Sequence, residues 1–102
     1  MTHPSDISQE HQRILPLNTG LSPSGELMIG GCNVVEMAQE YGTPLYLFDE
    51  AGLRQTMRAY REGLTSRWPR SRVCFASKSL PCVAAYAIAA AEGLPVDVVG
   101  EG

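Results

Sequence analysis

The chain has 102 residues, of which 44% are hydrophobic and 19% are charged, and its formal net charge at pH 7 is −3. This composition excludes an intrinsically disordered chain, and the longest apolar run is far below the roughly 20 residues that a membrane span requires. Nucleic acid and anionic membranes are poor principal partners for a mildly acidic protein, because both carry negative charge. The length fits one small domain.

Three cysteines, Cys32, Cys74 and Cys82, show no C-x-x-C spacing. This pattern disfavours a disulfide framework and a zinc site, so we expect no bound metal. Reduced thiols indicate the cytoplasm. The first residues lack the cationic stretch followed by an apolar one that marks a secretory signal, so nothing indicates export.

Polar and turn-forming residues dominate positions 1–22, and we expect a mobile or loosely draped arm there. Residues 26–29 favour a short strand. The glycine pair at 30–31 is expected to end that strand, because glycine adopts turn conformations at little cost.

A short helix is predicted over 34–41. Asn33 is a favourable N-cap, and Glu36 stands where a capping box requires an acidic partner. Gly42 is the residue most able to end the helix in a left-handed conformation. The β-branched and aromatic residues of 43–48 then predict a strand.

A longer helix is predicted after Asp49, which is a good N-cap. Apolar side chains recur along one face of this helix at helical spacing: Leu53, Met57, Tyr60 and Leu64. Three arginines on the same helix are expected to face water: Arg54, Arg58 and Arg61.

The run 67–72 contains three arginines and Trp68. One interpretation is contact with nucleic acid. The other is a solvated connection between helix and strand, with Trp68 folded onto the core. The overall acidity of the chain favours the second interpretation.

The last part of the chain predicts a strand, a helix and a second strand. The strands are expected over 73–78 and 94–99, and the helix between them has Pro81 in its first turn and ends at Gly93. A single crossover helix of this length joins two parallel strands into a right-handed βαβ unit. The fold class is therefore α/β.

The side chains of the first of these strands alternate between its two faces, which indicates where a reactive group would lie. Two sets of side chains point to opposite faces: Cys74, Ala76 and Lys78 on one, Val73, Phe75 and Ser77 on the other. The amine of Lys78 thus stands at a strand's carboxyl end, where parallel α/β folds collect their reacting groups. Lys78 is a candidate imine former, although a lysine at a strand end is most often only solvated.

Asp97 lies between Val96 and Val98 in the next strand. A buried carboxylate without a partner costs several kcal/mol, so we expect a partner. Lys78 or the polar groups of a cofactor are the natural candidates. The alternative is that Asp97 caps a turn.

Three segments together resemble a known family: Tyr41–Tyr46 (YGTPLY), Phe75–Cys82 (FASKSLPC) and Gly93–Val99 (GLPVDVV). In this order and spacing they are similar to the amino-terminal part of the diaminopimelate decarboxylases, which use pyridoxal 5′-phosphate (PLP). The similarity covers about residues 27–102. The chain departs from the family at Ser79-Leu80, where Ala-Phe is usual, and at 100–102, where Ser-Gly-Gly is usual.

The resemblance implies a fold. Residues 1–50 would be an amino-terminal arm and a segment of a β-rich second domain, and residues 51–102 would begin a PLP-binding (β/α)8 TIM barrel. Such a barrel needs roughly 250 residues, and the sequence stops after a fresh strand without its covering helix, so we expect an amino-terminal fragment. The fragment alone is expected to be inactive.

The resemblance also implies a chemistry. Lys78 matches the lysine that forms the imine with PLP, and Asp97 matches an aspartate beside the cofactor. The full-length protein would convert meso-diaminopimelate to L-lysine and CO2 in lysine biosynthesis, in a pocket completed by the second subunit of a homodimer.

Other functions stay open. Related PLP barrels include ornithine, arginine and carboxynorspermidine decarboxylases, alanine racemase and a non-catalytic PLP-binding protein. A dinucleotide-binding module is a different class, because Gly100-Glu101-Gly102 follows a strand, but the third glycine and the helix of that motif are missing.

Overall fold

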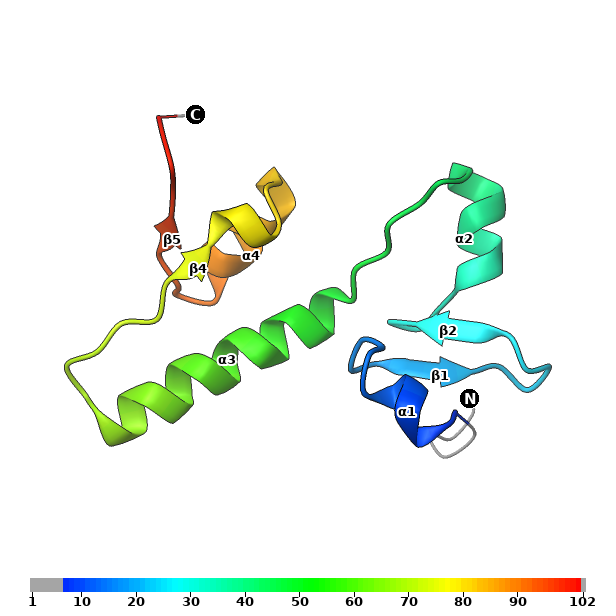
Figure 1. Cartoon of the computed structure of the whole chain (residues 1–102), viewed down its shortest axis with the longest axis horizontal. Helices are drawn as coiled ribbons and strands as arrows, with labels where there is room; N and C mark the ends of the chain where they lie inside the picture. Colours follow the sequence, from blue (N-terminus) through cyan, green and yellow to red (C-terminus); the bar gives the residue numbers. More distant parts are fainter. Residues whose placement is uncertain (1–6, 102) are drawn as a thin grey trace. The chain divides into compact units, whose positions relative to one another are not determined.

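The computed structural model describes residues 7–101, and expectations for positions 1–6 and 102 lie outside these residues. The chain forms two compact units, Met1–Gly52 and Leu53–Gly102 (Figure 1). No helix among residues 7–101 is both long enough and apolar enough to cross a bilayer.

The first unit holds an antiparallel sheet in the order β1-β2-β3 and two short helices. The elements are α1 (Gln9–Gln12), β1 (Thr19–Leu21), β2 (Leu27–Ile29), β3 (Cys32–Asn33) and α2 (Val34–Tyr41). The strand expected at 26–29 is confirmed as β2. The expectation of a loose arm up to residue 22 is wrong for α1, which Ser8 caps, and for β1, which pairs with β2 from Thr19↔Ile29 to Leu21↔Leu27. Local polarity did not reveal this strand, because its ladder depends on a partner across a turn.

The helix α2 forms where the sequence predicts it. The Asn33 side chain accepts hydrogen bonds from the backbone N–H groups of Val35, at 2.9 Å, and Glu36, at 3.3 Å. Gly42 ends the helix at φ +83°. The reciprocal bond of a capping box, from the Asn33 backbone N–H to the Glu36 carboxylate, is missing among the described residues. The Asn33 side-chain amide donates to the carboxylate of Glu26.

The segment 43–48 is not a strand, contrary to prediction. It has no ladder partner among the described residues, and Tyr46 and Phe48 are 87% and 57% exposed. β-branched and aromatic residues favour an extended backbone, but a strand also needs a neighbouring edge with which to pair.

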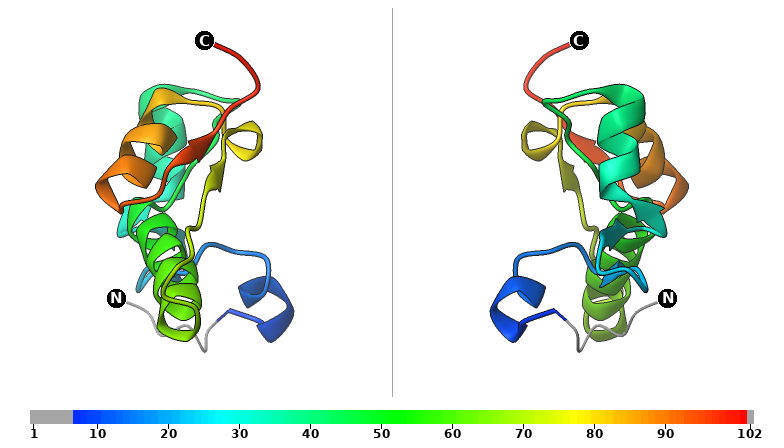
Figure 2. Two further views of the ribbon diagram at one scale, coloured as in Figure 1. Left: turned by 90° about the vertical axis from the view of Figure 1, so that its left-hand side faces the viewer. Right: turned by 90° about the vertical axis from the view of Figure 1, so that its right-hand side faces the viewer.

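The second unit combines two α-helices with a small parallel sheet. Its elements are α3 (Glu50–Arg67, which begins in the first unit), β4 (Phe75–Ala76), a 3-10 helix (Ser77–Ser79), α4 (Val83–Ala91) and β5 (Val96–Asp97). The pairing of β4 with β5 is parallel, as predicted, and α4 connects them beside the pair (Figure 2). Both strands are shorter than expected. Pro81 lies before the N-cap Cys82 and outside the first turn of α4.

The core of the second unit is small. Met57, Ala89 and Leu94 are buried together, and partly buried apolar side chains surround them: Val73, Phe75, Ile88 and Val96. The predicted apolar stripe of α3 is therefore only partly covered, because Tyr60 remains 68% exposed. Trp68 is 67% exposed, so the prediction that it folds onto the core is wrong.

Candidate functional site

Lys78 lies one short turn beyond the carboxyl end of β4. The 3-10 helix Ser77–Ser79 holds it there, with Leu80 N–H donating to the Ser77 carbonyl at 3.2 Å and Ser79 Oγ donating to the Ala76 carbonyl at 2.8 Å. The side chain of Lys78 is exposed. The prediction that the strand itself extends to Lys78 is wrong, because the backbone turns after Ala76.

The predicted division of faces is confirmed up to the end of β4. Val73 and Phe75 pack against the core of the second unit, whereas Cys74 and Ala76 are exposed. Ala76 is small, so the exposed face leaves room next to the turn that carries Lys78.

Asp97 is the last residue of β5 and lies opposite Ala76 in the parallel ladder. Its neighbour Val96 packs on the core side, so Asp97 is on the exposed face. The expectation of a buried carboxylate is therefore wrong. No hydrogen bond or ion pair joins it to Lys78 within residues 7–101, and an exposed carboxylate needs no such partner.

The parallel pairing brings an amine and a carboxylate to one edge of the sheet. Lys78 follows β4 and Asp97 ends β5, and parallel strands place their carboxyl ends at the same edge. A primary amine can form a covalent imine with a carbonyl compound, and a nearby carboxylate can orient polar groups or accept protons.

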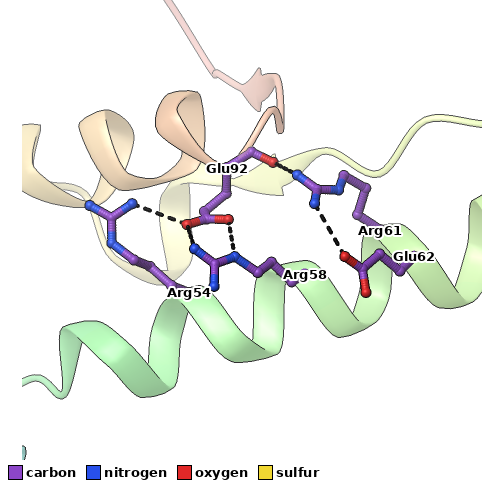
Figure 3. Close-up of polar contacts among 5 residues, drawn as sticks. All are labelled: Arg54, Arg58, Arg61, Glu62 and Glu92. Carbon is purple, nitrogen blue, oxygen red and sulfur yellow. Dashed lines mark hydrogen bonds and ion pairs between the residues drawn. The ribbon is translucent and has the colours of Figure 1, made fainter.

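A cluster of arginines around Glu92 escaped the sequence analysis (Figure 3). Arg58 binds the Glu92 carboxylate through Nε at 2.6 Å and through NH2 at 2.7 Å, and Arg54 NH1 reaches it at 3.1 Å. Arg61 donates to the Glu92 backbone carbonyl. The prediction that these arginines face water holds for Arg58, whose side chain is 51% exposed, and is wrong for Arg54 and Arg61, whose side chains are 30% and 34% exposed. Their spacing along one face of α3 was the available signal, but nothing in the sequence identified Glu92, 31 to 38 positions away, as their partner.

The hydrogen bonds between Arg58 and Glu92 shift the pKa values of both groups. Hydrogen bonds from Arg58 lower the pKa of the Glu92 carboxyl below its ordinary value, although burial opposes this. The same hydrogen bonds raise the pKa of Arg58. Glu92 is therefore a carboxylate at neutral pH, with its residue only 5% exposed.

Asp49 is a second buried carboxylate among residues 7–101, and its hydrogen bonds go to the backbone of α3 and to Asn18. Its Oδ1 accepts from the N–H of Gly52 at 3.0 Å, as the predicted N-cap of α3 should, and its Oδ2 accepts from the backbone and side chain of Asn18. Burial raises the pKa of Asp49, but these hydrogen bonds outweigh it, and the pKa lies below its ordinary value. A cavity of about 490 Å³ lies beside it, lined also by Cys32 and Met37.

Within residues 7–101 no group of three or more His, Cys, Asp or Glu side chains could hold a metal ion. The three cysteines are free and exposed.

Comparison with known proteins gives a consistent result. The chain is 45% identical over 93 residues to a diaminopimelate decarboxylase of Synechocystis sp., a match that covers 90% of this chain and 20% of that protein. It is 44% identical over 87 residues to the enzyme of that name from Actinosynnema pretiosum, and 38% identical over 78 residues to that of Bacillus subtilis. These matches cover 85% and 76% of this chain and 19% and 18% of the two relatives.

The resemblance to the diaminopimelate decarboxylases is confirmed. The chain spans about a fifth of the length of these curated relatives. The match to the Synechocystis decarboxylase includes Lys78, because a stretch of that length contains position 78 wherever it begins in this chain. No family model matches the chain. No solved structure matches it either.

Proposed function

We propose that this chain is the amino-terminal segment of a PLP-dependent diaminopimelate decarboxylase. The full-length protein would convert meso-diaminopimelate to L-lysine and CO2, as a step of lysine biosynthesis. One observation carries the proposal: the only lysine of a sequence that is 45% identical to such a decarboxylase lies exposed just beyond the carboxyl end of a parallel strand.

The residues at this edge fit PLP. Lys78 offers an accessible amine for covalent attachment, Ala76 leaves space beside it, and Asp97 supplies a carboxylate from the paired strand. When bound, PLP supplies an electron sink for the electron pair left by the departing CO2. Lys78 would hold the cofactor, and Asp97 would help to orient it.

The larger architecture is also part of the proposal. Residues 51–102 would form the first steps of a (β/α)8 barrel, which the parallel β4–β5 pair with its crossover helix supports. Residues 1–50 would belong to a β-rich second domain, which the antiparallel sheet β1-β2-β3 supports. The full-length protein would be a cytoplasmic homodimer whose second subunit completes the pocket. The chain alone would be inactive.

Release of CO2 from labelled substrate tests the function. The full-length protein with PLP should release CO2 from meso-diaminopimelate and form L-lysine, whereas residues 1–102 alone should release none. Ornithine, arginine and carboxynorspermidine are the comparison substrates. Faster release from any of them, or racemisation of alanine without CO2, would reassign the protein to another PLP barrel enzyme.

A further inference from the structure

The Glu92 carboxylate is held more firmly than an ordinary surface ion pair. Exposed pairs contribute little to stability, because water screens them and long side chains lose freedom. The Arg58 side chain is 51% exposed, but the Glu92 side chain is only 6% exposed, and Arg58 binds it with two parallel hydrogen bonds. Such forked geometry fixes direction as well as distance.

Glu92 stands where α4 turns into β5. It is the C-cap of α4, and its carbonyl accepts a hydrogen bond from Arg61 of α3. Gly93 follows at φ +77°, with its N–H donating to the Ala90 carbonyl, and Leu94 N–H donates to the Ala89 carbonyl at 2.9 Å. Arg54, Arg58 and Arg61 of α3 thus all donate to Glu92, the residue at which the chain leaves α4 towards β5 (Figure 3).

The ladder that follows is too short to determine its own register. Only two residue pairs, Phe75↔Val96 and Ala76↔Asp97, join β4 to β5. A slip by one residue would move Asp97 to the core face and place an apolar valine on the exposed face, because successive side chains alternate. What fixes the register must therefore include contacts outside the ladder.

We propose that Glu92 is a positioning residue: held by Arg58 and Arg54, it sets the start of β5 and so presents Asp97 at the same edge as Lys78. The inference rests on the proposed function in one respect, because it takes Asp97 to face PLP. In this proposal Glu92 acts through Asp97 and needs no contact of its own with the cofactor or the substrate.

Two substitutions in the full-length protein measure this role. Glu92→Ala removes both acceptor atoms, and the dissociation constant of PLP should rise 10-fold or more. Glu92→Gln keeps one acceptor oxygen for Arg58, so this variant should retain most of the wild-type affinity for PLP. The matched control is Glu62→Gln, since Glu62 is 70% exposed and contacts Arg61 at 3.5 Å; this substitution should leave PLP binding unchanged.

A double-mutant cycle with Asp97→Asn separates positioning from general support of the fold. If Glu92 acts through Asp97, Glu92→Ala should weaken PLP binding less than 2-fold in the Asp97→Asn background. Equal effects of Glu92→Ala in both backgrounds would overturn the proposal. If Glu92→Ala fails to fold, Arg58→Lys replaces it in the cycle, because lysine cannot reproduce the forked contact.

Hydrogen exchange of the peptide 93–99 gives a readout that does not depend on PLP. Its amides should exchange at least 10-fold faster in Glu92→Ala than in the wild type, and at the wild-type rate in Glu62→Gln. Unchanged exchange in Glu92→Ala would overturn the positioning role even if the full-length protein binds PLP. Faster exchange in Glu92→Ala, together with no PLP binding by the wild-type protein, would instead retain the positioning role and reject the proposed function.

Discussion

The proposed chemistry depends on two side chains: Lys78, in the turn that follows β4, and Asp97, at the end of the paired strand β5. Sequence alternation predicted correctly which side chains of 73–76 face the core, because apolar Val73 and Phe75 must leave water. It did not predict the turn at Ser77, since local hydrogen bonds of the serines close a 3-10 helix there. Nor did it predict that Asp97 would be exposed, because Val96 and Val98 on either side of it are typical of a buried strand.

The substitution Asp97→Asn tests the carboxylate itself. In the full-length protein it should reduce PLP affinity or turnover by 10-fold or more, equivalent to about 1.4 kcal/mol. Spectroscopic titration with PLP and steady-state kinetics measure both quantities. Wild-type values for both would leave Asp97 as a solvated strand end.

Asp49→Ala tests the N-cap of α3. The substitution removes the acceptor of the Gly52 N–H and both hydrogen bonds from Asn18. The free energy of unfolding of the full-length protein should fall by about 1 kcal/mol or more. Denaturant titration measures it, with exposed Glu40→Ala as the control. Equal stability of the two variants would show that the Asp49 cap does not stabilise α3.

At the scale of elements, helices were easier to predict than strands. The bounds of α2 follow from Asn33 and Gly42, which act on their immediate neighbours. The strand predicted at 43–48 and the missed strand β1 both depended on whether a distant edge was available. The contact between α3 and Glu92 was missed for the same reason, because 34 residues separate Arg58 from its partner.

The link between α3 and α4 should depend on pH. The pKa of Glu92 is lowered in the folded state from an ordinary value of 4.5, so the unfolded state binds more protons around that pH. The stabilisation is therefore fully present above about pH 4.5 and is lost as the pH falls through the lowered pKa. Denaturant titration of the full-length protein from pH 7 to pH 3 measures this. The difference in the free energy of unfolding between wild type and Glu92→Gln should shrink on acidification. A difference that stayed constant or grew would contradict the proposed ion pair.

At the scale of the whole molecule, the described residues bury little. The buried apolar residues are Met57, Ala85, Ala89 and Leu94, while large side chains such as Tyr46 and Trp68 are mostly exposed. The resemblance to the decarboxylases predicted a piece of a larger fold, and the short parallel ladder agrees with an α/β segment. Composition alone could not indicate this, because 44% hydrophobic content is ordinary for a complete domain.

Residues 1–102 alone should not unfold cooperatively. Net stabilities of whole domains are only about 5 to 15 kcal/mol, so a core this small leaves little to offset chain entropy. Thermal melting followed by circular dichroism should give a broad transition or aggregation. A sharp, reversible transition with stoichiometric PLP binding would show instead an independent domain.

Reduction of the PLP-loaded full-length protein with borohydride, followed by peptide mass mapping, tests whether Lys78 forms the imine with PLP. Lys78 is the only lysine among these 102 residues, so a label within them is unambiguous. We predict one pyridoxyl group per chain, on the peptide that contains Lys78, and its loss in Lys78→Ala. A label on a lysine elsewhere in the full-length protein, or no label at all, would contradict the account.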